Sequence, residues 1–171
     1  MDSTNPWHLS LALAVTGALA WASISDLQVR KIPNACVLTI VALFAIWATL
    51  RGGIGVKSSV IAAAISFTIG FGLYRLGVMG AGDVKLFSAL ALFAGLELLG
   101  TFALSTAIGG GLVALSFMII QPTRGAVMFA LKGKGDYGPG IPYGIAISLG
   151  ALLVIWGGLA QLLPVTLTGL P

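Results

Sequence analysis

Charged residues are scarce in this sequence. Only 8% of its 171 residues are Asp, Glu, Lys or Arg, whereas 58% are hydrophobic, and soluble domains carry about 25% charged residues. So few polar side chains cannot cover a soluble globule, so the composition predicts a protein of the lipid bilayer. The net charge of +4 does not indicate nucleic-acid binding, because the basic residues lie in short breaks between apolar runs and not along one polar face.

Cysteine is almost absent as well. The single cysteine, Cys36, excludes an internal disulfide and a Cys-x-x-Cys zinc site within this chain. We expect Cys36 to be a small buried side chain.

Apolar runs divide the chain into about six segments. A helix of about 20 residues crosses a hydrocarbon core about 30 Å thick. The runs therefore predict an all-α membrane bundle, with about six transmembrane helices in a single integral-membrane domain over residues 1–171, and with the first and fourth helices adjacent. Glu97 and Gly100 mark the turn after the fourth run, and an amphipathic turn at 126–131 is expected inside the longest break. The runs cover residues 7–25, 35–50, 58–76, 86–99, 101–120 and 143–163.

Basic residues gather in alternate breaks. The breaks at about 26–34, 77–85 and 121–142 hold, in or beside them, seven of the nine Lys and Arg residues, and the break after the second run holds the other two. By the positive-inside bias, the three basic breaks face the cytoplasm and both termini face outward from the inner (plasma) membrane. The seven are Arg30, Lys31, Arg75, Lys85, Arg124, Lys132 and Lys134; the two are Arg51 and Lys57.

Two acidic residues stand on the predicted cytoplasmic side. Asp83 lies where the fourth helix begins, and one interpretation is that it caps that helix. Asp26 follows the carboxyl end of the first run, where the helix dipole disfavours an anion, so its structural alternative is an ion pair with Arg30. Because ionisable residues at membrane depth point to function, we predict that Asp26 and Asp83 form a catalytic pair.

Residues near the two acids are further candidates for the site. Gly80 and Gly82 can adopt positive φ and let a substrate strand approach the backbone, and the structural alternative is a flexible turn. Lys85 is two residues from Asp83 and faces away from it on a helix, which leaves it free to meet a lipid phosphate or an acidic group of the substrate. Candidate substrate contacts, of which Tyr143 is alternatively an interfacial anchor, are Pro33, Asn34, Pro142 and Tyr143.

Three ordered motifs carry a family resemblance. They are Ser25-Asp26 leading to Ile32-Pro33-Asn34, then Gly80-x-Gly82-Asp83-x-Lys85, then Ile141-Pro142-Tyr143-Gly144. Together they resemble the prepilin peptidase family of type IV leader peptidases, which are GxGD membrane aspartyl proteases. The resemblance implies removal of the leader from type IV prepilin-like membrane proteins at the cytoplasmic face. It implies the lipid bilayer and the prepilin as partners, no nucleic acid, and leaves a homo-oligomer open.

The chain differs from the long members of that family. It lacks the large cytoplasmic segment with paired Cys-x-x-Cys motifs that accompanies methylation of the new pilin terminus, so methylation has no support here. The length of the chain and the residues of its motifs favour the short branch that serves Flp pili of tight-adherence systems, with archaeal-type preflagellin peptidases as the alternative. A presenilin-type protease is disfavoured because the Pro-Ala-Leu and Tyr-Asp motifs are missing.

The chemistry of the pair follows from two neighbouring carboxyl groups. They do not both ionise easily, so one keeps a proton while the other takes a proton from the attacking water. This hydrolysis needs no metal ion and no cofactor. A non-enzymatic small membrane transporter, in which the same acids bind cations or relay protons, is the alternative of another class.

Overall fold

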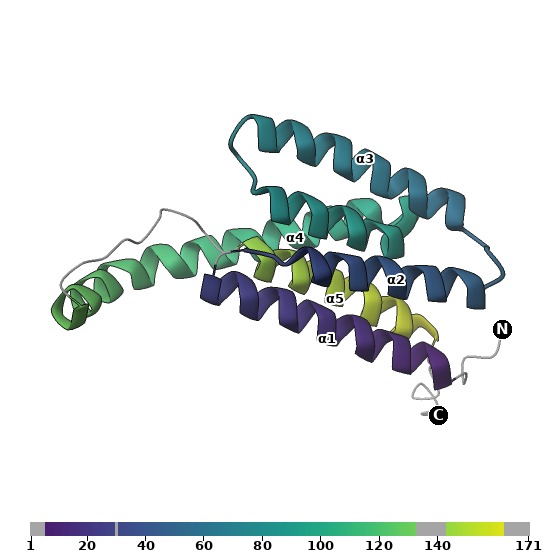
Figure 1. The fold of residues 1–171 in the computed structure, drawn as a ribbon, viewed down its shortest axis with the longest axis horizontal. Helices are drawn as coiled ribbons and strands as arrows, with labels where there is room; N and C mark the ends of the chain where they lie inside the picture. Colours follow the sequence, from purple (N-terminus) through teal and green to yellow (C-terminus); the bar gives the residue numbers. More distant parts are fainter. Residues whose placement is uncertain (1–5, 30, 133–142, 163–171) are drawn as a thin grey trace, which may run out of the picture.

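All regular structure in the described part of the chain is helical, which confirms the all-α prediction. The computed structural model describes residues 6–29, 31–132 and 143–162, and these residues form five helices (Figure 1). The predicted first, second, third and sixth runs correspond to α1, α2, α3 and α5. The bounds are α1 Pro6–Val29, α2 Asn34–Leu50, α3 Val56–Arg75, α4 Ala81–Lys132 and α5 Tyr143–Leu162.

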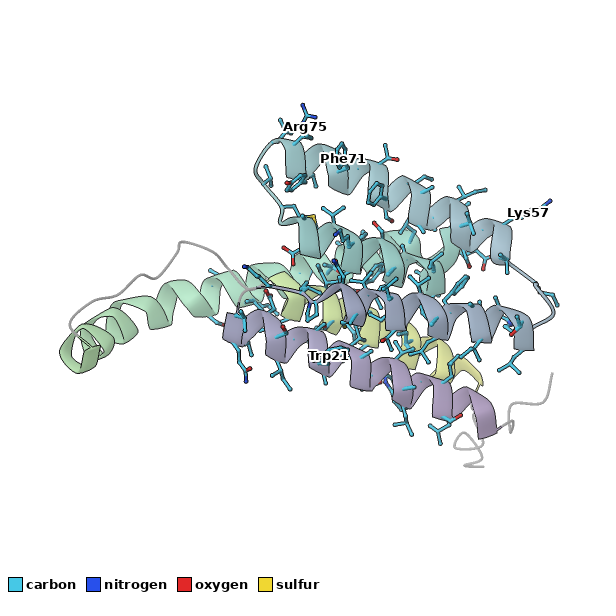
Figure 2. All side chains as sticks on the ribbon, viewed as in Figure 1. Trp21, Lys57, Phe71 and Arg75 are labelled. Carbon is cyan, nitrogen blue, oxygen red and sulfur yellow. The ribbon has the colours of Figure 1, made fainter. Side chains whose placement is uncertain are left out.

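Three segments of the described residues have the length and apolar composition of membrane spans: Leu9–Val29, Val56–Arg75 and Ala81–Val113, of which the last contains the break at Gly95. Helix α2 and residues 144–156 of α5 are shorter apolar helices. Large apolar side chains are exposed along the outside of the bundle, including Trp21 on α1 and Phe71 on α3 (Figure 2). A soluble protein rarely exposes apolar patches of this extent, so the outer surface is suited to lipid.

Helix α4 reverses its direction at Gly95, which has non-helical torsion angles of φ 61° and ψ −177°. The rings of Phe87 and Phe102 stack with their centroids 4.4 Å apart, although a straight helix would separate these positions by about 22 Å. The Leu96 N–H donates to Ser58 Oγ of α3 at 2.9 Å, which satisfies a backbone donor at the break. Figure 1 shows the second part of α4 running back beside the first. The reversal is at Gly95, not at the predicted turn between Glu97 and Gly100.

The second part of α4 is longer than the predicted fifth run. It continues to Lys132, so the break expected from Gln121 begins later, and residues 126–131 belong to this long helix. Pro122 removes one backbone hydrogen bond, but the residues after it are mostly good helix formers, which allow the helix to continue. Residues 133–142 lie outside the described part of the chain.

The helices pack around a core shared by α1, α2, α4 and α5 (Figure 1). Helix α1 packs mainly on α2 and α5, whereas α4 packs on α2, α3 and α5. Helices α1 and α4, whose adjacency was predicted, contribute residues to one core, and α2 and α5 each pack on both and join them. Cys36 is buried as predicted, and its thiol donates to the Ala18 carbonyl at 3.2 Å. The largest fully buried side chains are Val15, Leu19, Cys36, Ile40, Leu86, Phe102 and Ile147.

We expect Gly95→Ala to destabilise the bundle. The backbone conformation of Gly95 is essentially restricted to glycine and costs another residue about 1–3 kcal/mol, and an added Cβ would lie 3.3 Å from Ser58 Oγ. Thermal unfolding of the detergent-purified protein should show a lower Tm. Gly100→Ala is the matched control, because an added Cβ there meets nothing within 4 Å. Equal Tm values for the two variants would contradict this role of Gly95.

Candidate active site

Asp83 lies in the first turn of α4 and caps it. The Gly80 carbonyl accepts the first bond of the helix from Val84 N–H at 3.1 Å, and the Asp83 carboxylate bonds back to the Gly80 backbone N–H. A Cβ at Gly80 would lie 2.9 Å from Asp83 Oδ2, so glycine leaves room for this contact. The capping interpretation of Asp83 is correct, and it does not compete with a role in the pocket described below.

Gly80 and Gly82 do not use the positive φ that glycine allows. In the described part of the chain, the positive-φ glycines are Gly52, Gly53, Gly55, Gly77 and Gly95. Gly82 instead supplies space: a Cβ there would lie 3.2 Å from Ile32 Cβ. Because Gly82 has no Cβ, the linker between α1 and α2 lies directly against the first turn of α4. The left-handed residue in the connection from α3 to α4 is Gly77.

Asp26 lies inside the last turn of α1, because this helix continues to Val29 and does not end at Ser25 as predicted. Its side chain is buried, with 7% of its surface exposed. The Gly144 N–H donates to Asp26 Oδ2 at 2.8 Å, and Gly144 is the second residue of α5. The positive end of the α5 dipole thus offsets the unfavourable place of an anion at the end of α1. Arg30, the alternative partner, lies outside the described residues.

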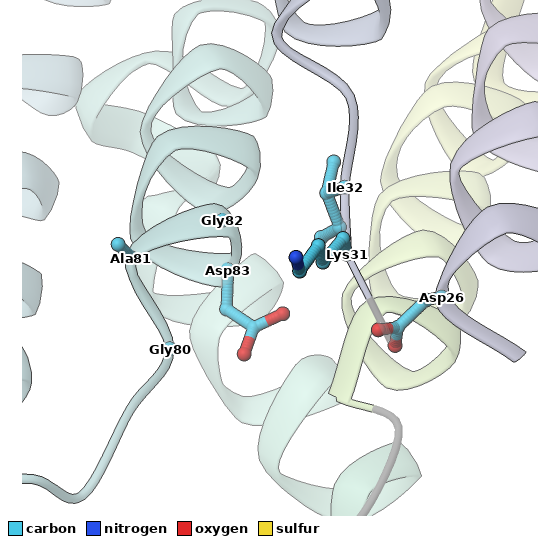
Figure 3. Close-up of a pocket in the computed structure, with 7 residues that line it drawn as sticks. All are labelled: Asp26, Lys31, Ile32, Gly80, Ala81, Gly82 and Asp83. Carbon is cyan, nitrogen blue, oxygen red and sulfur yellow. The ribbon is translucent and has the colours of Figure 1, made fainter. Parts of the chain in front are cut away.

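The two acids line one cavity of about 340 Å³. Figure 3 shows their carboxylates pointing toward each other, Asp26 from α1 and Asp83 from α4. They are close enough for the charge of Asp26 to act on Asp83. The cavity is lined by Asp26, Lys31, Ile32, Gly80, Ala81, Gly82 and Asp83. The structure thus brings together both acids and both glycines that the sequence singled out.

Lys85 and Asn34, two other candidates, bond to each other outside the cavity. Lys85 Nζ donates to Asn34 Oδ1 at 3.2 Å and ties α4 to the start of α2. Pro33 precedes α2, and its carbonyl accepts the Cys36 N–H at 3.1 Å. None of these three residues lines the cavity. Pro142 lies outside the described residues, and of Tyr143 only the backbone, at the start of α5, is described.

Sequence reasoning missed four residues of the site. In the sequence, Lys31 is one of several basic residues in a charged break, and Ile32, Ala81 and Gly144 are only members of the three motifs. The one signal for Gly144 was its place beside Pro142 and Tyr143 in the third motif. No pattern in the sequence indicated that its amide would meet Asp26, 118 residues earlier.

Comparison with known protein families identifies the class. A model of the type IV leader peptidase family matches residues 13–168. The chain belongs to this family. The resemblance found in the motifs is confirmed, and the protein is a membrane-embedded peptidase of the type IV leader peptidase kind. Comparisons with curated proteins and with solved structures gave no match.

We expect Gly80→Ala to fold but to lose peptidase activity. The added Cβ would lie 2.9 Å from Asp83 Oδ2 and push this carboxylate out of its place, and a misplacement near 1 Å can cost about 100-fold in rate. Peptidase rate and Tm should be measured together. Gly72→Ala, where an added Cβ meets nothing within 4 Å, is the control. A Gly80→Ala rate equal to that of Gly72→Ala would show that this glycine does not position Asp83.

Proposed function

We propose that this peptidase removes the leader peptide of type IV, Flp-like prepilins at the cytoplasmic face of the inner membrane, with Asp26 and Asp83 as its catalytic pair. The observation that carries the proposal is the shared cavity: two acids 57 positions apart, on helices that pack mainly on other helices, turn their carboxylates to the same space. Membership of the type IV leader peptidase family supports the substrate class.

The pair supplies general acid and base catalysis. One carboxylate takes a proton from a water molecule as its oxygen attacks the scissile carbonyl carbon, and the other, protonated carboxyl hydrogen-bonds the developing oxyanion. When the tetrahedral intermediate collapses, the C–N bond breaks and the leaving amine receives a proton from the pair. Two close carboxyl groups titrate together, so a shared proton is the natural resting state. A cavity of about 340 Å³ has the size of a small ligand pocket.

The distribution of basic side chains supports a cytoplasmic cavity. Lys31 lines it, and Lys85 is two residues from Asp83. Arg75 ends α3 on the side from which the chain enters α4, whereas Lys57 lies at the other end of α3 (Figure 2). Cations are favoured on the cytoplasmic side of a membrane protein, so the end of the bundle that holds the cavity is assigned to the cytoplasm.

The surroundings of the cavity also suit a substrate that itself lies in the membrane. Leu27 and Val29, which follow Asp26 on α1, are more than half exposed, as are Leu76 and Val78 before α4. A prepilin presents an apolar helix preceded by a polar leader. Exposed apolar side chains beside the two acids offer a surface for such a helix, while the acids meet the polar segment.

Asp26→Asn and Asp83→Asn should each abolish cleavage of an Flp prepilin in membranes. Asparagine keeps the side-chain shape but removes the proton-transfer group, and loss of such a group costs about 100- to 10,000-fold. Cleavage should be followed by the shift of the prepilin band and by sequencing of the new amino terminus. Glu97 is an exposed acid beyond the Gly95 reversal. The control variant Glu97→Gln should therefore cleave prepilin normally. Normal cleavage by either Asp variant would remove that residue from the mechanism.

The assigned orientation can be tested with single cysteines in a Cys36→Ala background. Val78→Cys lies before α4 at the cavity end, and Ile54→Cys lies in the turn between α2 and α3; both positions are exposed. In intact cells, a membrane-impermeant maleimide should label position 54 and should reach position 78 only after permeabilisation. The reverse pattern would place the cavity on the outer face.

A further inference from the structure

The backbone amide of Gly144, on α5, is a hydrogen-bond donor to Asp26 of α1. It donates to Oδ2 at 2.8 Å in a buried contact. The first four N–H groups of an α-helix have no partner within the helix, and Gly144 is the second residue of α5. Its N–H is therefore available for Asp26 without loss to α5. The contact joins the third motif of the sequence to the first.

Gly144 also packs directly on the carboxylate. A Cβ at this position would lie 2.8 Å from Asp26 Oδ2 and 3.1 Å from both Cγ and Cβ of the same residue. Real Cβ atoms essentially never approach below 3.0 Å. Any side chain at position 144 would thus move Asp26 as a whole, not only the tip of its side chain.

Further polar contacts join α5 to α1 along the two helices. Ser148, one turn after Gly144, is buried, and its hydroxyl lies 2.7 Å from the Gly144 carbonyl and 3.4 Å from the Leu19 carbonyl of α1. Farther along, Trp156 Nε1 donates to Thr16 Oγ1 of α1 at 3.2 Å. The contacts of Ser148 and Trp156 with α1 fix how α1 is placed along α5. They therefore set where Asp26 stands relative to the amide of Gly144.

We propose that Gly144 is the positioning residue of the Asp26 carboxylate, through an N–H that holds Oδ2 and a missing side chain that lets α5 approach. With Oδ2 held by the amide, the orientation of the Asp26 carboxylate is set, and this carboxylate points toward Asp83 across the cavity (Figure 3). The inference rests on the proposed function of the pair. It adds the start of α5 to the machinery as a third element, beside the end of α1 and the start of α4 (Figure 3).

The first test compares Gly144→Ala with Gly17→Ala, a glycine of α1 where an added Cβ meets nothing within 4 Å. For prepilin cleavage we expect kcat of Gly144→Ala to fall by about 10- to 100-fold. KM should change by less than about twofold, because a displaced acid affects the transition state more than substrate binding. Gly17→Ala should keep both values. Wild-type kcat in Gly144→Ala, or a change confined to KM, would overturn the proposal.

A second variant removes only the N–H and adds no atom that could clash. Cell-free synthesis into lipid nanodiscs can place glycolic acid at position 144, which replaces the amide N–H by an ester oxygen. We expect kcat to fall here too, with normal helix content. Lactic acid in place of Ala35, the second residue of α2, is the matched control and should leave kcat unchanged. If the protein with the ester at position 144 cleaves prepilin as fast as the protein with the ester at position 35, the hydrogen bond has no role in positioning Asp26.

A third readout does not depend on cleavage. In protein labelled with ¹⁵N-glycine, the Gly144 amide resonance, assigned by its loss in Gly144→Ala, should move when Asp26→Asn removes the charged acceptor. It should stay in place in Glu97→Gln. An unchanged chemical shift of the Gly144 amide in Asp26→Asn would overturn the inference even if the peptidase is active. If the wild type fails to cleave prepilins, the proposed function fails, and this resonance still decides whether Gly144 holds Asp26.

Discussion

A carboxylate inside an apolar helix bundle needs hydrogen-bond donors, and unpaired backbone N–H groups are concentrated in the first turn of a helix. Asp83 uses the start of its own helix through Gly80, and Asp26 uses the start of α5 through Gly144. Both helices must therefore begin at the end of the bundle where α1 finishes. The chain leaves this end in the first part of α4 and must return before α5 can start there. The reversal at Gly95 provides that return.

The same constraint explains how residues with no common helix build one cavity. Gly82 lets Ile32 approach α4, and the bond from Lys85 to Asn34 fastens the start of α2 to the same turn. The linker between α1 and α2 is thus held beside Asp83 while Asp26 is held by α5. Two acids fixed by separate elements can thus stand opposite each other although α1 and α4 each pack mainly on other helices. A peptidase that places water between two carboxyl groups needs this arrangement.

Much of the helix pattern was predictable because glycine, proline and charge interrupt a chain that is otherwise apolar. Helices α2 and α5 begin within a residue of the predicted runs, and both acids were found because carboxylates are rare in such a sequence. Gly95 was not predicted as the reversal, since nothing local distinguishes it from Gly100. Continuation of α4 past Pro122 depends on the helix formers that follow. The pairing of α1 with α5, and hence Gly144, depends on contacts between distant residues, which spacing alone does not reveal.

The central claim is that Asp26 and Asp83 of one chain form one site. Its most direct test is to combine the two inactive variants, Asp26→Asn and Asp83→Asn, in the same membranes and measure prepilin cleavage against each variant alone. Because both acids line one cavity of a single molecule, no mixture of the two should recover cleavage. Recovery of cleavage in the mixed membranes would show that the acids act from different copies of the chain, and it would contradict the account.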